Sequence, residues 1–260
     1  RRSSQLSLYS ANTPQLPNTA ARLTGVHHEE FGRPLPGFLH VTQPDYHGAR
    51  KPGESADEFS ARLAAELGSL IDAQPSGSVA AFFAEPVSFS AGVMVPPASY
   101  FPRIAEVLDA RGVDFVADEV ITGFGRTGAL FGCETLGLKP DHCTIAKAIT
   151  GGYFPLSAVA LGRDLYDDLE TGSDSVGVLA HAATHAAHPV GAAAALKTLE
   201  IIERDGLVAH AAKMGEHLAR QLDALAGHPP VGNTRPIGLA GAGAFLPRGG
   251  DDAPEPDDAE

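Results

Sequence analysis

Three ionisable side chains stand directly after short apolar stretches of this sequence, and their types suit one kind of chemistry. They are Glu85, Asp118 and Lys147. A lysine amine condenses with an aldehyde to form a Schiff base. An acid beside a pyridine-type nitrogen keeps that ring protonated, so the ring can accept electrons from a carbanion. The sequence therefore indicates a lysine and an acid arranged around an electron-withdrawing cofactor.

The size of the electrostatic effect supports this pairing. A carboxylate about 4 Å from the ring nitrogen contributes about 4 kcal/mol at an effective dielectric constant of about 20. This equals about three pKa units, which is enough to keep a weakly basic pyridine cationic at neutral pH. The same residue types also have plainer uses, because acids after strands often cap the next helix and lysines are mostly on the surface. The pattern alone leaves both interpretations open.

The elements expected to position these residues are strands that alternate with amphipathic helices. Continuous apolar runs, typical of strands covered on both faces, occupy residues 79–84, 113–117 and 144–146, with a fourth strand over 156–161. Helical periodicity predicts helices at 55–71, about 99–111, about 189–204 and about 207–226. Ser55 and Ser99 are the N-cap candidates for the first two helices, and the segment Ser55-Ala56-Asp57-Glu58 predicts a capping box. The stretch 31–54, rich in Pro and Gly, is expected to be loop.

This alternation indicates an α/β fold with a mostly parallel sheet and flanking helices. Ligands of open α/β sheets bind beyond the carboxyl ends of the strands. Because the strands expected before Glu85, Asp118 and Lys147 would end at one edge, the three side chains are expected to meet there.

Composition excludes several other classes. The net charge of −13 argues against a nucleic-acid partner, and no run of about 18 apolar residues predicts a membrane span. Cys133 and Cys143 lack a metal-type spacing, so two reduced thiols in a cytoplasmic protein are expected. His181, His185 and His188 could form a cluster on a helix, but no acid stands near them, and no metal is expected.

Several segments follow one another in a characteristic order. They read AEPV at 84–87, VPP at 95–97, VADEVITGFGRTG at 116–128, TIAKAITGGY at 144–153 and PLSAV at 155–159. Together, with 29 residues from Asp118 to Lys147, they resemble the class III pyridoxal-phosphate-dependent aminotransferases of the omega-amino acid or amine:pyruvate type. The similarity runs from about residue 23 to about residue 242.

The resemblance implies a role for each matching position, with pyridoxal 5′-phosphate as cofactor. Lys147 would bind the cofactor as a Schiff base and move a proton between the substrate Cα and the cofactor C4′ carbon. Asp118 would pair with the pyridinium, Val120 would pack on one face of the ring, and Glu85 would lie near the ring edge. Thr184 would reach the cofactor phosphate of the neighbouring subunit, which implies a homodimer.

One segment departs from the family pattern. Around Thr184, Ala182, Ala186 and Ala187 stand where the family usually has Gly, Ser and Gly. If a glycine there has positive φ, alanine costs about 1 kcal/mol. Tyr46-His47-Gly48 imitates a family motif at the wrong place, and the glycines around Arg126 are expected to serve turn geometry.

The resemblance also implies a division of the chain. Residues 1–22 are expected to be irregular or disordered, and 23–204 to form a partial large domain of pyridoxal-phosphate transferase fold type I. Residues 205–248 would begin the C-terminal small domain, and 249–260 would form an acidic disordered tail. The family's phosphate-binding turn and stacking aromatic are not found, so an incomplete chain that binds the cofactor weakly is expected.

The function that follows is the transfer of an amino group from an amine or omega-amino acid to a keto acid such as pyruvate. Two alternatives stay open. One is a related pyridoxal-phosphate decarboxylase or epimerase on the same scaffold. The other is a non-catalytic truncated remnant of such an enzyme.

Overall fold

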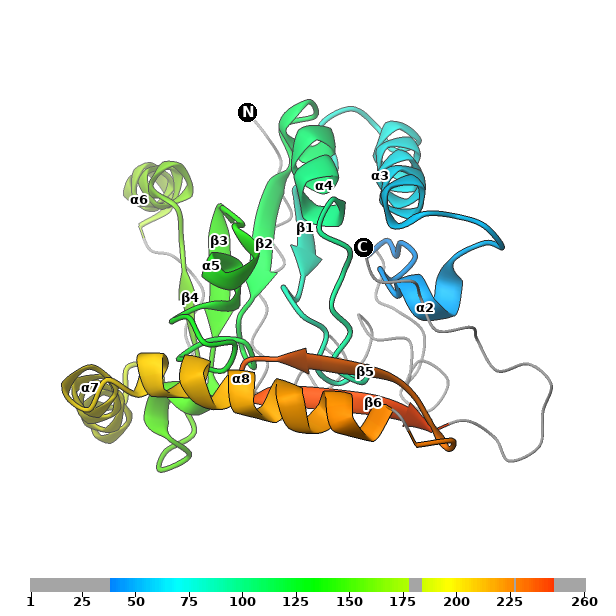
Figure 1. Ribbon diagram of the computed structural model, residues 1–260. Coiled ribbons are helices and arrows are strands. Elements are labelled where there is room, and N and C mark those ends of the chain that lie inside the picture. The colour runs from blue at the N-terminus through cyan, green and yellow to red at the C-terminus, as the bar shows by residue number, and fades with distance from the viewer. Residues whose placement is uncertain (1–37, 178–183, 227, 246–260) are drawn as a thin grey trace.

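The computed structural model describes residues 38–177, 184–226 and 228–245 (Figure 1). The expected irregular N-terminus (1–22) and acidic tail (249–260) lie outside these residues. Within the described ranges, no helix is long and apolar enough to cross a membrane.

A four-stranded sheet forms the centre of the fold, in the order β1-β2-β3-β4. Its strands are β1 (Ala81–Ala84), β2 (Asp114–Asp118), β3 (His142–Ile145) and β4 (Ala158–Ala160). The first three are parallel, whereas β4 runs antiparallel to β3. A parallel neighbour would need a crossover, usually through a helix, and only the 3₁₀ turn η1 (Lys147–Thr150) stands between β3 and β4. The α/β fold with a mostly parallel sheet is confirmed.

Two helices cover one face of this sheet. α3 (Ala56–Asp72) packs against α4 (Tyr100–Asp109), and α4 contacts β2. Their apolar faces share one core with the sheet residues Phe115 and Ala117, and Phe59 of α3 and Ile104 of α4 are almost fully buried there. The predicted helical periodicity is therefore confirmed by the packing. Ser99 occupies the N-cap position of α4, but its side chain makes no capping hydrogen bond.

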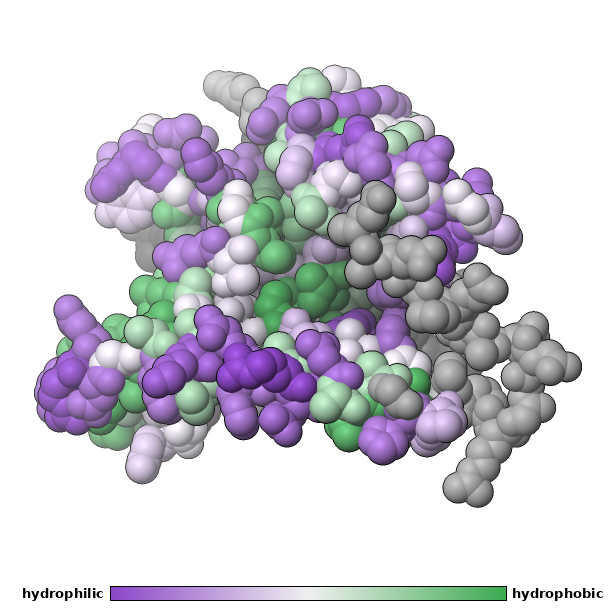
Figure 2. Space-filling model, viewed as in Figure 1, coloured by the Kyte–Doolittle hydropathy of each residue, from purple (hydrophilic) through white to green (hydrophobic). Residues whose placement is uncertain are grey.

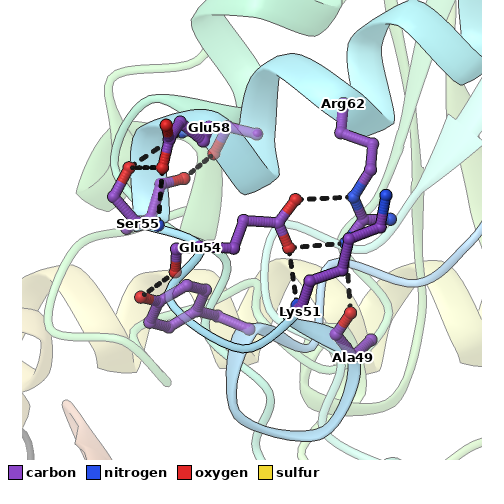
Figure 3. Close-up of polar contacts among 9 residues, drawn as sticks. Ala49, Lys51, Glu54, Ser55, Glu58 and Arg62 are labelled. Atoms are coloured by element: carbon purple, nitrogen blue, oxygen red, sulfur yellow. Dashed lines mark hydrogen bonds and ion pairs between the residues drawn. The ribbon is translucent and has the colours of Figure 1, made fainter.

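The start of α3 is held by two adjoining polar groups (Figure 3). Ser55 and Glu58 form the predicted capping box, in which each side chain bonds the other's backbone N–H. Beside it, Arg62 donates to Glu54 with Nε–Oε1 at 2.6 Å and Nη2–Oε2 at 2.8 Å. The Lys51 N–H also donates to Glu54, and these bonds lower the pKa of Glu54 to about 2. This network fixes the chain that leads into the helix.

A second layer lies beyond the strands' carboxyl ends (Figure 1), where the arrowheads of β1 and β2 point toward α8 and a hairpin. α8 (Leu207–Ala226) packs on β5 (Val231–Ile237) and β6 (Ala240–Phe245), and α7 (Pro189–Arg204) packs on η1. The predicted helices at 189–204 and 207–226 are confirmed at both ends. On the face of the molecule seen in Figure 2, apolar residues gather in the middle, between the upper helices and α8.

Six elements of the described residues were not expected from the sequence. They are α2 (Tyr46–Ala49), α5 (Gly132–Leu136), the 3₁₀ turn η1, α6 (Arg163–Val176) and the two strands of the β5–β6 hairpin. α2 is a single turn within the stretch 31–54, where loop was expected. The hairpin escapes prediction because β6 alternates alanine with glycine, which gives no apolar period to detect.

Candidate active site

The three ionisable residues predicted from sequence meet at one edge of the sheet. Glu85 follows the last residue of β1, Asp118 is the last residue of β2, and Lys147 comes two residues after β3. Since these strands are parallel neighbours, their carboxyl ends lie side by side. Burial raises the pKa of Glu85, and the charges of the two neighbours also act on it: that of Asp118 raises it and that of Lys147 lowers it.

Asp118 is half-buried, with one carboxylate oxygen engaged. The Val120 N–H donates to its Oδ1 at 3.0 Å. Burial raises the pKa of Asp118, while this hydrogen bond, the Thr144 hydroxyl and the Lys147 charge lower it. A carboxylate with these neighbours suits a cationic ring partner, which would offset the burial cost.

Lys147 has a strained backbone. Its φ is +49°, in the left-handed region that side chains other than glycine rarely adopt. This conformation costs about 1–2 kcal/mol. Lys147 is the first residue of η1, and the residue that follows η1, Gly151, is also left-handed. The lysine side chain is exposed among the described residues. Backbone strain of this kind concentrates at functional residues.

Glu85 is held by the loop that follows β1. The Ser88 hydroxyl donates to its Oε1 at 2.9 Å, and the Phe89 N–H lies 3.4 Å from its Oε2. Burial is the main cause of the raised pKa of Glu85. The loop is in turn tied to the second layer, because Arg235 Nε donates to the Gly92 carbonyl at 3.0 Å.

Glu119, next to Asp118, has a structural role that the sequence did not reveal. Its side chain is 1% exposed and accepts from the backbone N–H groups of Gly132 at 2.8 Å and Cys133 at 2.7 Å. The Thr122 hydroxyl also donates to it. Glu119 therefore joins the chain after Asp118 to the start of α5. Its carboxylate accepts from the first N–H groups of that helix and so caps it. In the sequence, Asp118 and Glu119 both follow the apolar run, so the pattern does not distinguish the structural acid from the acid expected at the cofactor.

The remaining predicted residues lie in two places. Val120 is buried two residues after Asp118. Thr184 lies on the exposed turn before α7. The residue after that turn, His188, stacks its ring on Phe154 with centroids 5.0 Å apart. Phe154 is bonded to the end of η1, because the Thr150 hydroxyl donates to its carbonyl.

Ala187, in the same turn, has φ of +54°. It therefore carries the strain expected if the family's glycine there adopts positive φ. Ala182 lies outside the described residues, as does His181 of the histidine cluster. Among the described residues, no group of three or more His, Cys, Asp or Glu side chains could hold a metal ion.

Other motifs have structural places. The Tyr46 ring packs edge-on against Phe59 at 5.6 Å, and its hydroxyl donates to the Glu54 carbonyl at 2.8 Å, so this tyrosine belongs to the α3 core. Arg126 and Leu239 exchange two hydrogen bonds, from the Arg126 side chain at 3.1 Å and from the Leu239 N–H at 2.9 Å. Arg126 therefore joins the turn at 123–128 to the hairpin. Cys133 and Cys143 are free thiols.

Two cavities are lined by residues other than the three at the strand ends. One of about 420 Å³ is lined by α8, the Thr127–Ala129 turn and the hairpin. Another of about 270 Å³ lies between α2 and the hairpin. Neither includes Glu85, Asp118 or Lys147 among its lining residues.

An acid at the end of one parallel strand, with a lysine after its neighbour, offers the ring-nitrogen partner and the Schiff-base amine that a pyridoxal-phosphate enzyme requires. The comparisons agree. A sequence model of the family described as aminotransferase class-III matches residues 19–248. The chain belongs to the class III aminotransferases.

Individual relatives show the same relationship. An uncharacterized aminotransferase of Sinorhizobium fredii is 43% identical over 227 residues, 86% of this chain and 49% of that protein. Gamma aminobutyrate transaminase 2 of Solanum lycopersicum is 40% identical over 84% of this chain and 48% of its own length. The solved omega transaminase from Pseudomonas jessenii in complex with PMP is 40% identical, with a TM-score of 0.85 over 87% of this chain and 51% of that chain. The chain thus spans about half the length of the curated relatives it matches.

The residues present fit the family's cofactor, pyridoxal 5′-phosphate. Asp118 offers a carboxylate at the end of β2, and Lys147 offers an exposed amine after β3. The Thr144 hydroxyl, next to Asp118, is buried with no hydrogen-bond partner of normal geometry. A buried hydroxyl beside the acid can support that carboxylate when it faces a cationic ring.

Proposed function

We propose that this chain forms the catalytic core of a pyridoxal-phosphate-dependent aminotransferase. The reaction is the transfer of an amino group from an amine or omega-amino acid to a keto acid such as pyruvate. The observation that carries the proposal is the meeting of Asp118 and Lys147 at the carboxyl ends of adjacent parallel strands. Since the chain spans about half of its relatives, the activity proposed is that of the whole protein.

Pyridoxal phosphate, when bound, supplies a protonated ring that withdraws electrons from a substrate carbon. Lys147 would bind the cofactor through its amine, and that amine would then take the proton from the substrate Cα. Its place in the strained turn η1 supports this role, because the turn holds the lysine at the end of the sheet beside Asp118.

Asp118 would hold the proton on the ring nitrogen. Its Oδ1 is oriented by the Val120 N–H, so the carboxylate is positioned before the cofactor arrives. Glu85 would support the ring edge, held by Ser88. Val120 would exclude water from one face of the ring, a role that its apolar side chain and burial support.

Thr184 would bind the cofactor phosphate of a second subunit, so the proposed assembly is a homodimer. The proposed location is the cytoplasm. The exposed position of Thr184 on the turn before α7 supports a contact with another chain. The matched relatives include both a gamma aminobutyrate transaminase and an omega transaminase, and we propose an amine or omega-amino acid as donor on that basis.

The proposal is tested with the whole protein, pyridoxal phosphate, an omega-amino acid and pyruvate, by following alanine formation. The expected result is alanine formation that Asp118→Asn lowers by roughly a thousandfold, because an amide does not hold the ring charge worth about 4 kcal/mol. Asp114→Asn is the matched control. Asp114 lies at the opposite end of β2, where its Oδ2 is 3.2 Å from His142 Nε2, and its replacement should leave the rate nearly unchanged.

Product analysis separates the alternatives. Release of carbon dioxide from an amino acid substrate, or loss of its chirality without alanine formation, would replace transamination by decarboxylation or epimerisation. An equal loss of rate in both aspartate variants would contradict the role of Asp118.

A further inference from the structure

One buried hydroxyl, that of Thr144, adjoins the Asp118 carboxylate and lowers its pKa. Thr144 is 5% exposed, and its Oγ1 makes no hydrogen bond of normal geometry. Buried polar atoms without a partner are rare in folded proteins, and each one calls for a physical reason. Replacing such a hydroxyl by a methyl group would remove the desolvation cost, yet the sequence has threonine here.

The position of Thr144 provides that reason. It is the register partner of Asp118, on the neighbouring parallel strand. Partners in register point to the same face of a sheet, so the hydroxyl lies beside the carboxylate. The backbone there is fixed, because the Glu119 N–H donates to the Thr144 carbonyl at 2.9 Å. Lys147 follows three residues later.

The charged groups around Asp118 create a need for this donor. Burial and the charge of Glu119 disfavour the ionised carboxylate, as does Glu85 across the sheet end, while Lys147 favours it. The Val120 N–H engages Oδ1. A second donor on the carboxylate would favour the ionised form and fix its plane.

We propose that Thr144 is a positioning residue, whose hydroxyl donates to the Asp118 carboxylate and holds it ionised and correctly oriented for a ring nitrogen. The part concerning the ring rests on the proposed function. The part concerning Asp118 does not, and it holds in the chain without cofactor.

The test compares Thr144→Val, which keeps the shape and removes the hydroxyl, with Thr144→Ser, which keeps the hydroxyl. The carboxyl carbon of Asp118 is followed by NMR titration of the chain without cofactor, with the signal assigned by its loss in Asp118→Asn. We expect the valine variant to raise the pKa of Asp118 by about one pH unit, and the serine variant to leave it near the wild-type value. An unchanged pKa in the valine variant would overturn the proposal.

Stability and cofactor affinity complete the test. The melting temperature of the valine variant should stay close to the wild-type value, because the loss of one hydrogen bond is offset by removal of the cost of burying a hydroxyl. A large fall restored by serine would mean that the hydroxyl is structural, and would overturn the positioning role. The affinity for pyridoxal phosphate, measured by fluorescence titration, should fall about tenfold in valine but not in serine. If the pKa of Asp118 responds and no variant, wild type included, binds the cofactor, the proposed function fails while the Thr144–Asp118 contact stands.

Discussion

Glu119 and Cys133, 14 residues apart in the chain, are joined by a buried hydrogen bond of 2.7 Å from the Cys133 N–H to Glu119 Oε1. The other carboxylate oxygen accepts from the Gly132 N–H and the Thr122 hydroxyl. Gly132 could not carry a side chain here, because a Cβ would lie 2.6 Å from Thr122 Cβ. This network holds the segment that begins at Asp118, so the acid at the end of β2 depends on it.

We therefore expect Glu119→Gln to destabilise the fold. A glutamine amide presents N–H groups to at least one of the three donors, so a buried donor loses its acceptor. The free energy of unfolding should fall by about 2 kcal/mol. Urea denaturation measures this, with Glu134→Gln as control, because Glu134 is exposed and should change stability by less than about 0.5 kcal/mol. Equal effects of the two changes would contradict the role of Glu119.

The Glu54–Arg62 pair predicts a pH dependence of stability. The hydrogen bonds from Arg62 are the main cause that lowers the pKa of Glu54 from 4.5 to about 2. Between these two values the unfolded chain binds more protons than the folded chain, so the Glu54 contribution is complete above the upper value and is lost as the pH falls. Glu54→Gln should lower stability at neutral pH and flatten the fall in this window. Glu170→Gln, on the exposed side of α6, should leave the slope as in the wild type.

The turn before α7 offers a gain in stability. Ala187 has φ of +54°, whereas Ala186 is not among the residues of positive φ. Ala187→Gly should therefore raise the free energy of unfolding by roughly 0.5–1 kcal/mol. Ala186→Gly should lower it by roughly 0.5 kcal/mol, because glycine there only adds freedom to the unfolded chain. Thermal melts of the two variants would show opposite shifts, and shifts of the same sign would refute the strain at Ala187.

The sequence predicted the elements with strong local signals. The bounds of α7 and α8 are confirmed because each helix has a clear apolar period, with Pro189 at the start of α7. The capping box at Ser55 is confirmed for the same kind of reason. β1 and β4 are shorter than the predicted runs, β2 is shifted by one residue and β3 begins two residues earlier, since an apolar run does not show where its hydrogen-bonded ladder starts and ends.

Features that depend on distant contacts could not be predicted. β4 runs antiparallel to β3 because no helix crosses over between them. The β5–β6 hairpin is stabilised by packing on α8. The two approach so closely that a Cβ on Gly215 would lie 2.7 Å from Gly238. The meeting of Glu85, Asp118 and Lys147 follows from strand order and was predictable. The positive φ of Lys147 and the burial of Thr144 beside Asp118 could be seen only in the structure.

The central claim is that Lys147 holds the cofactor beside Asp118, and covalent labelling tests it most directly. The chain is loaded with pyridoxal phosphate, reduced with borohydride to fix the pyridoxal group on its lysine, digested and mapped by mass spectrometry. Four other lysines provide internal controls: Lys51, Lys139, Lys197 and Lys213. The label should appear on Lys147, should be absent after Lys147→Ala, and should weaken in Asp118→Asn. A label mainly on any of the four other lysines, or one unaffected by the loss of Lys147, would contradict the account.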